Sequence, residues 1–252
     1  MLFGRRPAAL SEMFWEPLEK FIIRNGALIC SLRPGFWRKR IGPHAERISA
    51  KGCMMENCVG FIDGSKLRMS RPGGQNLIQR AAYSGHKRFH CLNFQTITVP
   101  DGIVLHLFGP LEGRRHDSTL YRSSGIDQDL EEMLMIDGGQ HCIHGDPAFL
   151  YRPWAQVGFK GPNLDEGKKN FNRSMSKARI CAERAYKDIK LHFAFIDFSR
   201  KKKALESPIS LLCIFAALLI NFEICFGHGS QAMRYFSCLP PDLKKYLEDN
   251  EW

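Results

Sequence analysis

The stretch RFHCLNFQTITVPDGIVLHLF, residues 88–108, decides the fold class. Residues 88–99 are rich in aromatic and β-branched residues, which is the composition of a β-strand. The Pro-Asp-Gly triplet at 100–102 supplies a tight turn, and residues 103–108 return as a second apolar run. The stretch therefore predicts an antiparallel β-hairpin.

Two further strands are predicted on either side of this hairpin. The apolar run CVGFID, residues 58–63, is typical of a buried strand, and HCIHGD, residues 141–146, has a similar form. A polar, helical stretch at about 117–134 separates the second of these strands from the hairpin. Helices are expected at 174–193, where apolar residues step by three or four, and at about 207–226.

This order of elements predicts a mixed α/β sheet covered by helices. The first 50 or so residues also have a helical pattern, with Ser11 as a candidate N-cap and with interruptions at Pro34 and Pro43. We therefore expect a helical amino-terminal arm over residues 1–54, a main domain over residues 55–230 and a tail over residues 231–252.

The charge of the chain points to a polyanionic partner. Lysine and arginine total 36 against 26 acidic residues, which gives a formal charge of +10. Soluble proteins this basic often bind nucleic acid, so nucleic acid is the expected partner. A basic surface without a specific partner is the alternative.

The cysteines and the longest apolar run bear on the compartment. The nine cysteines form no CxxC pair and have irregular spacing, which favours a reducing compartment. The clean apolar run in residues 209–226 is about a dozen residues long, short of the roughly 20 that a membrane span needs. We therefore expect a buried core helix there and no membrane as a partner.

Two acidic residues each follow a predicted strand. Because ligands of such sheets gather at the carboxyl ends of strands, we expect Asp63 and Asp146 at one edge. Glu183 lies 37 positions after Asp146 (183 − 146) and borders the apolar stripe of the predicted long helix. Three carboxylates offer the oxygen ligands that Mg²⁺ or Mn²⁺ prefers, and two such ions can activate water against a phosphodiester.

Two of these acids also have plainer interpretations. Gly-Asp-Pro at 145–147 has the composition of a turn, so Asp146 taken alone is a turn residue. Glu183 has Arg179 and Lys187 four residues to either side, a spacing that suits pairs along a helix. The residues alone leave these alternatives open.

The chain resembles PIF/Harbinger-type DDE transposases over about residues 55–230. The resemblance implies an α/β, ribonuclease-H-like mixed sheet flanked by helices, here with the short helical amino-terminal arm. Asp63 matches the aspartate of the family's DG motif, Asp146 that of its GD motif and Glu183 the glutamate of its ER motif. The matching segments, in order, are GFIDGS (60–65), YSGHKRFHCLNFQ (83–95), VPDG (99–102), GPLEGRRHDS (109–118), GDPAFL (145–150), FNRSMSKARICAERAYKDIK (171–190) and FAALLINFEI (215–224).

The resemblance also implies an activity. Transposases of this type cut DNA at element ends and join the freed 3′-hydroxyl to target DNA, with Mg²⁺ or Mn²⁺ as two bound ions. Asp63, Asp146 and Glu183 are then both the catalytic residues and the metal ligands. The expected location is the nucleus, with the cytoplasm as a second compartment. The expected partners are DNA, a separate DNA-binding protein and a second copy of the chain.

Asp117 competes with Asp146 for the second position, because the HD of GPLEGRRHDS also belongs to the family pattern. We rank it lower, since it lies at the start of a predicted helix, where it suits capping.

Basic residues beside these acids are candidate DNA contacts. YSGHKRFH, residues 83–90, combines basic and aromatic side chains that suit phosphate contact and base stacking, although a solvated strand face is the alternative. A basic stripe also borders Glu183. The predicted DNA-binding residues are His86, Lys87, Arg88, Arg179, Lys187 and Lys190.

The chain departs from the family at two places. It has GDPAFLYRP where the family often has GDxGYP, and Pro147 removes a backbone donor directly after Asp146. The amino-terminal DNA-binding helices of a full transposase are missing or shortened. These departures favour the alternative function, a transposase-derived DNA-binding or interaction protein that has lost catalysis. RKKK, residues 200–203, is a candidate nuclear import signal.

Overall fold

The structure is a computed structural model that describes residues 6–73, 76–197 and 208–248. Within its helices, the side chains of residues 7, 181–186, 188, 190, 195 and 197 lie outside the described part. The candidate import signal at 200–203 also lies outside the described residues.

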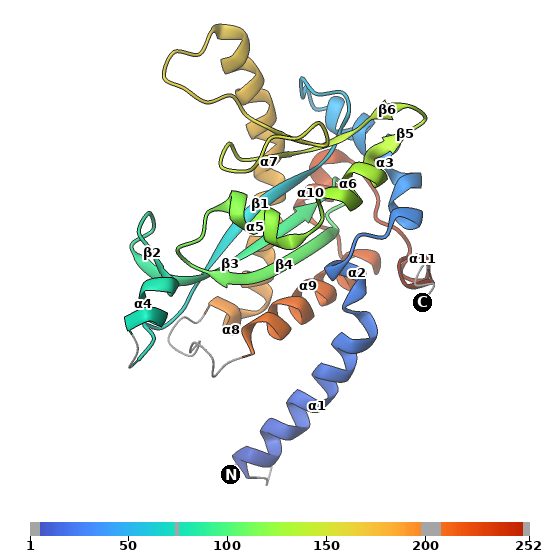
Figure 1. Ribbon diagram of the computed structural model, residues 1–252. Helices are drawn as coiled ribbons and strands as arrows, with labels where there is room; N and C mark the ends of the chain where they lie inside the picture. The colour runs from blue at the N-terminus through green and yellow to red at the C-terminus, as the bar shows by residue number, and fades with distance from the viewer. Residues whose placement is uncertain (1–5, 74–75, 198–207, 249–252) are drawn as a thin grey trace.

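The strands form a mixed sheet around β1 (Figure 1). β1 pairs antiparallel with β3, and β3 pairs antiparallel with β4, so the predicted hairpin is confirmed. β7 pairs parallel with β1, and β8 pairs parallel with β7, which gives the order β4-β3-β1-β7-β8. The bounds are β1 (Cys58–Arg68), β2 (Tyr83–Ser84), β3 (Phe89–Thr98), β4 (Val104–Glu112), β5 (Met135–Ile136), β6 (Gly139–Gln140), β7 (Cys142–Gly145) and β8 (Ala155–Val157).

Helices cover both faces of this sheet. In Figure 1, α5 lies in front of the strands, where it packs on β3 and β4, and α7 passes behind them, where it packs on β1 and β7. The fold is therefore the expected α/β, ribonuclease-H-like sheet flanked by helices. The bounds are α1 (Pro7–Asn25), α2 (Ala27–Cys30), α3 (Pro34–Ser49), α4 (Asn76–Ala82), α5 (Asp117–Ser124), α6 (Asp127–Leu134), α7 (Glu166–His192), α8 (Ala194–Asp197), α9 (Ile209–Cys225), α10 (Gln231–Phe236) and α11 (Leu243–Glu248).

Several predicted element bounds were wrong. The helix expected at 117–134 is two helices, because Gly125 adopts a left-handed conformation (φ 70°) between them. β8 lies in a segment for which no strand was predicted, since three residues between turns carry no alternation. α7 begins at Glu166 rather than at about 174. Asp165 caps it by accepting a hydrogen bond from the Lys168 amide (2.8 Å).

The amino-terminal helices also begin at residues other than those predicted. α1 begins at Pro7 with Arg6 as its N-cap, so Ser11 lies inside the helix. The expected interruption at Pro34 is confirmed, because α2 ends at Cys30 and α3 begins at Pro34, whereas Pro43 lies inside α3 and does not interrupt it. Pro34 occupies the first turn, where a missing N–H is tolerated. Burial of Trp37 and the other apolar residues of α3 outweighs the roughly 3 kcal/mol that an interior proline such as Pro43 costs.

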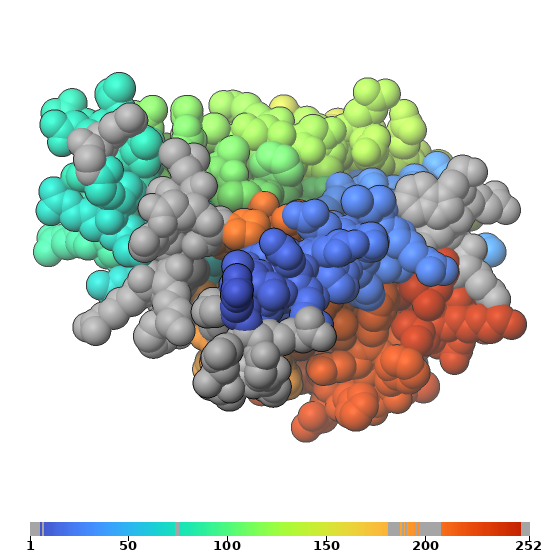
Figure 2. Space-filling view, turned by 90° about the horizontal axis from the view of Figure 1, so that it is seen from below, coloured from blue at the N-terminus to red at the C-terminus, as the bar shows by residue number. Residues whose placement is uncertain are grey.

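These helices share the core of the sheet. Leu28 and Ile29 of α2 and Trp37 of α3 belong to the same hydrophobic cluster as Ile62 of β1. Figure 2 shows the blue amino-terminal segment seated between the green and the red parts of the chain. The arm expected at 1–54 therefore supplies buried side chains to the body of the molecule.

α9 is a buried core helix, as expected for the apolar run. Its polar residue Asn221 is fully buried and faces β4. The Asn221 amide donates to Val104 O (2.9 Å) and to the Tyr246 hydroxyl (2.8 Å), and its oxygen accepts from Val104 N (2.8 Å). Among the described residues, no helix is both long and apolar enough to cross a membrane.

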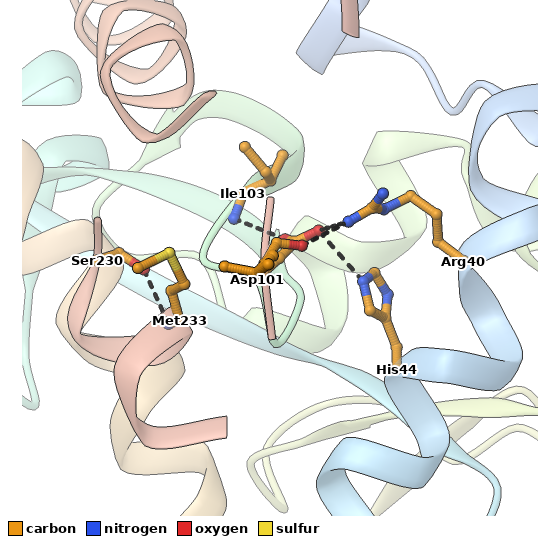
Figure 3. A network of polar contacts seen from close by, with 7 residues as sticks. Arg40, His44, Asp101, Ile103, Ser230 and Met233 are labelled. Carbon is orange, nitrogen blue, oxygen red and sulfur yellow. Dashed lines mark hydrogen bonds and ion pairs between the residues drawn. The ribbon is translucent and has the colours of Figure 1, made fainter. Parts of the chain in front are cut away.

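A buried ion-pair network ties α3 to the hairpin turn (Figure 3). Asp101 accepts hydrogen bonds from Arg40 (2.7 Å), from His44 (3.2 Å) and from the Ile103 amide (3.1 Å). Burial alone raises the pKa of Asp101, but His44 and Arg40 outweigh it and hold that pKa below its ordinary value. The turn of the hairpin is therefore anchored to the helix by a fully satisfied carboxylate.

Candidate active site

Two aspartates from adjacent strands line one cleft. Ile62 of β1 is opposite Gly145 of β7 in the parallel pair, so Asp63 and Asp146 follow matched positions on strands that lie about 4.8 Å apart. Both side chains line an open cleft of about 1030 Å³. The structure thus brings together two of the three predicted site acids, and their role as metal ligands stays a prediction.

Asp63 was expected at the end of its strand, but it lies inside β1. β1 continues to Arg68 and stays paired with β3 along this length. β7 stops at Gly145, so Asp63 lies where β1 loses its parallel neighbour. The cleft opens at this point because one side of β1 has no strand beside it.

Asp63 is paired with an arginine from α7. Arg179 Nη1 lies 3.2 Å from Asp63 Oδ1, with 19% and 20% of the two side chains exposed. Arg179 was predicted as a DNA contact, and it does line the cleft. Its position beside Asp63 places a positive charge directly at the cluster of acids.

Asp146 forms a turn and also lines the cleft. Its Oδ1 accepts a hydrogen bond from the Ala148 amide (2.7 Å), and its backbone oxygen accepts one from the Phe149 amide (3.0 Å). It is therefore a turn residue that also lines the cleft. The absent N–H of Pro147 leaves this turn intact, because Ala148 and Phe149 supply the donors.

Asp117 is a third acid that lines the cleft, and its lower rank as a catalytic residue stays a prediction. α5 has His116 as its N-cap without a side-chain cap hydrogen bond, so the capping role expected of Asp117 is not observed. A Cβ on Gly64 would lie 2.6 Å from Asp117 Oδ1, so the carboxylate packs directly against the residue after Asp63. Burial, and then the charge of Asp146, raise the pKa of Asp117 against the opposing effect of Lys66.

Glu183 lies on α7, one turn beyond Arg179. Its side chain is outside the described part of the structure, so neither its predicted metal role nor its pairing with Arg179 and Lys187 is tested. Among the described side chains, no group of three His, Cys, Asp or Glu residues is arranged to hold one metal ion.

Comparison with known protein families identifies the chain. A family model described as DDE superfamily endonuclease matches residues 62–221, which is more than half of the chain. The protein belongs to this endonuclease family. The match begins one residue before Asp63 and ends at Asn221 of α9. Searches of curated proteins and of solved structures found no match.

One wall of the cleft is basic. His86 and Lys87, from the turn after β2, line it together with Arg114 and Arg115, from the segment between β4 and α5. All four residues are exposed. His86 and Lys87 were predicted as DNA contacts. Arg114 and Arg115 were not, although this adjacent pair directly precedes the HD motif.

The other predicted DNA contacts are not among the described residues that line the cleft. Arg88 occupies the turn before β3 with φ 57° and is not among the residues that line the cleft. Lys187 is exposed on α7, and the side chain of Lys190 lies outside the described part. Of the six predicted contacts, His86, Lys87 and Arg179 line the cleft.

His144 belongs to β7 and lies two residues before Asp146 in the chain. It is 4% exposed, and neither ring nitrogen has a hydrogen-bond partner among the described residues. Burial, and then the charge of Arg179, lower the pKa of His144 to about 4. The imidazole is therefore neutral at pH 7, and it packs near the ring of Phe171, with centroids 6.2 Å apart.

Proposed function

We propose that this chain is the nuclease domain of a PIF/Harbinger-type transposase that cuts DNA phosphodiesters with divalent metal ions. One observation carries the proposal: Asp63, Asp117 and Asp146 come from three separate elements and line one cleft that has a basic wall. Such acids hold cations, and such a wall attracts the phosphates of DNA.

The acids of the cleft fit Mg²⁺ or Mn²⁺ by their chemistry. Asp63, Asp117 and Asp146 offer only oxygen atoms, which are the ligands that these hard ions prefer. The charge of Asp146 raises the pKa of Asp117, and this is a repulsion that a bound cation relieves. In the proposal Asp63, Asp146 and Glu183 hold two ions, and Asp117 is an added acid beside them.

The ions, when bound, supply activation of water and stabilisation of charge on phosphate oxygens. The protein's own residues do the rest. His86, Lys87, Arg114 and Arg115 hold the DNA backbone along the cleft. Arg179 neutralises Asp63 when no ion is bound, so ion binding must compete with this pair.

The finer features follow from the transposase type. Strand transfer, in which a freed 3′-hydroxyl attacks target DNA, is the proposed second step. The proposal also includes action in the nucleus, a separate DNA-binding partner protein and assembly with a second copy of the chain.

A second candidate function is a transposase-derived DNA-binding or interaction protein without catalysis. The Asp63–Arg179 ion pair favours it, because the arginine already provides a positive charge at the first acid.

Nicking of supercoiled DNA by the full chain in Mg²⁺ or Mn²⁺ tests the proposal. We expect nicking by the wild type and loss of nicking in Asp146→Ala and Glu183→Ala. Glu131→Ala, an exposed acid in α6, is the matched control and should nick normally. Metal-dependent nicking that survives both site substitutions contradicts the site. DNA binding without nicking by the wild type supports the second function.

A further inference from the structure

A second hollow lies on the other side of the loop that follows Asp146. It has a volume of about 520 Å³, and its walls include Pro147, Phe149, Tyr151, Phe159 and Phe171, which we call the aromatic pocket. Alternate residues of this loop line different hollows. Asp146 and Ala148 line the cleft, whereas Pro147 and Phe149 line the aromatic pocket. One short turn therefore separates the aromatic pocket from the acids of the cleft.

Phe159 presents an exposed ring that is nevertheless held in place. Its side chain is 45% exposed. Asn172 of α7 holds its backbone with two hydrogen bonds, accepting from Phe159 N (2.9 Å) and donating to Phe159 O (3.0 Å). Its ring also packs edge-on against Phe171, with centroids 5.2 Å apart. A ring fixed on one side and open on the other is a ready stacking surface.

The loop that carries Tyr151 is anchored too. Asp127 of α6 accepts hydrogen bonds from Arg152 Nε (3.0 Å) and from Trp154 Nε1 (2.8 Å). Tyr151 lies directly before this anchor and is 62% exposed. The exposed rings of Tyr151 and Phe159 lack the stabilisation that burial gives, about 1.5–3 kcal/mol for a large apolar side chain. A partner that covers these rings would gain binding free energy from their burial.

The charges around the aromatic pocket indicate what binds there. Lys160 lines it and is exposed. Lys168 Nζ, which also pairs with Asp165 (2.9 Å), lies 5.9 Å from the centre of the Phe159 ring. Aromatic faces beside lysines are the combination that takes a base by stacking and its phosphate by charge. A groove for an apolar peptide segment needs no such cations.

The distance from the acids also suits a nucleic acid strand. Phe171 and Arg179 lie eight residues apart on α7 (179 − 171), which is about 12 Å along a helix. That length corresponds to about three or four nucleotides at roughly 3.4 Å each along a stacked strand. A strand whose phosphate lies at the acids can therefore reach the aromatic pocket.

We propose that the aromatic pocket binds an unpaired nucleobase of the DNA strand whose backbone lies in the cleft. Phe159 and Tyr151 stack on the base, and Lys160 and Lys168 contact its phosphates. The inference rests on the proposed DNA function, which it deepens by naming unpaired or splayed DNA as the form that is bound.

The test uses the full chain in EDTA with a short single-stranded oligonucleotide that contains 2-aminopurine, and with a duplex of the same sequence. Base stacking quenches the fluorescence of this probe. We expect Phe159→Ala and Tyr151→Ala each to weaken single-strand binding roughly ten- to a hundredfold and to abolish the quenching. Duplex affinity should stay within about twofold, because the basic wall is intact.

Two further variants make the test specific. Phe159→Trp retains a stacking face and should restore binding and quenching. Phe226→Ala removes an exposed ring (69%) just after α9, outside the pocket, and should change nothing. Circular dichroism of each variant checks folding, and if one of the two alanine variants unfolds, the other decides the result.

The outcomes separate this inference from the proposed function. Wild-type binding and nicking of duplex DNA, with single-strand affinity and quenching unchanged in both alanine variants, overturns the inference alone and leaves the pocket to a protein partner. Equal losses for single strand and duplex also overturn it, because stacking on an unpaired base does not weaken duplex binding. Failure of the wild type to bind either DNA overturns both.

Discussion

Two aspartates of this protein each pair with an arginine, in opposite surroundings. Asp101 is fully buried, and Arg40, His44 and a backbone amide satisfy it. Asp63 keeps 20% of its side chain exposed, pairs with Arg179 and lies beside other acids. The same pair of residue types therefore anchors the fold in one place and lines an open cleft in the other. What decides the difference is whether the carboxylate is sealed from solvent and fully hydrogen-bonded.

The largest expected effect is the loss of the sealed carboxylate. Asp101→Ala removes the fully buried carboxylate that pairs with Arg40 and His44, and breaking a buried ion pair costs about 3–5 kcal/mol. We expect the free energy of unfolding to fall by this amount in urea denaturation. A loss below about 1 kcal/mol would mean that the network in Figure 3 contributes little, and the comparison with Asp63 would fail.

Two buried histidines extend the comparison to pH. Burial lowers the pKa of His106 in the core, and that of His144 behind the cleft, to about 4. Because the ordinary value is about 6.5, the unfolded chain takes up protons between pH 6.5 and 4 that the folded chain refuses. Stability should therefore fall as pH falls through this window, by up to roughly 3 kcal/mol for each histidine.

Unfolding measured between pH 7 and pH 4 checks this prediction. His106→Leu and His144→Leu should each flatten the pH dependence relative to the wild type. A slope that is unchanged in both variants would show that these imidazoles titrate normally.

The basic wall should affect binding rather than folding. Lys87→Ala and Arg114→Ala each remove one candidate phosphate contact, so each should lower the slope of log affinity against log salt by about 0.9. Fluorescence anisotropy with duplex DNA at several salt concentrations measures it. Lys39→Ala, an exposed lysine of α3 outside the cleft, is the control, and an equal effect there would mean that only net charge matters.

The smallest expected effect on stability is at the open pair. Asp63→Asn removes a partly exposed ion pair, and such pairs contribute about 0–1 kcal/mol. We expect the free energy of unfolding to change by less than about 1 kcal/mol, in contrast to Asp101→Ala. A loss as large as that of Asp101→Ala would show that Asp63 is a structural residue.

Local patterns predicted the sheet well. The hairpin and the strands that carry Asp63 or precede Asp146 were visible because each contains a distinct apolar run, although β1 continues past Asp63 to Arg68. β8 was invisible, since three residues carry no periodicity. The extent of α3 was hidden by Pro43, whose cost is overcome by burial that only the tertiary structure shows.

The site was predictable only in part. Asp63 and Asp146 could be paired in advance because each directly follows an apolar strand run, and these runs form a parallel pair in which Ile62 is opposite Gly145. The partnership of Asp63 with Arg179, and the packing of Asp117 against Gly64, join residues 116 positions (179 − 63) and 53 positions (117 − 64) apart. Neither contact leaves a local signal, so the three-dimensional fold was needed to find them.

The Asn221 side chain has a consequence for how the sheet ends. An outer strand offers unpaired N–H and C=O groups that invite a strand from another molecule. Asn221 meets both such groups of Val104, as a neighbouring peptide bond would. A single amide from α9 thus takes the place of the next strand at this point of β4 and protects the chain against edge-to-edge aggregation.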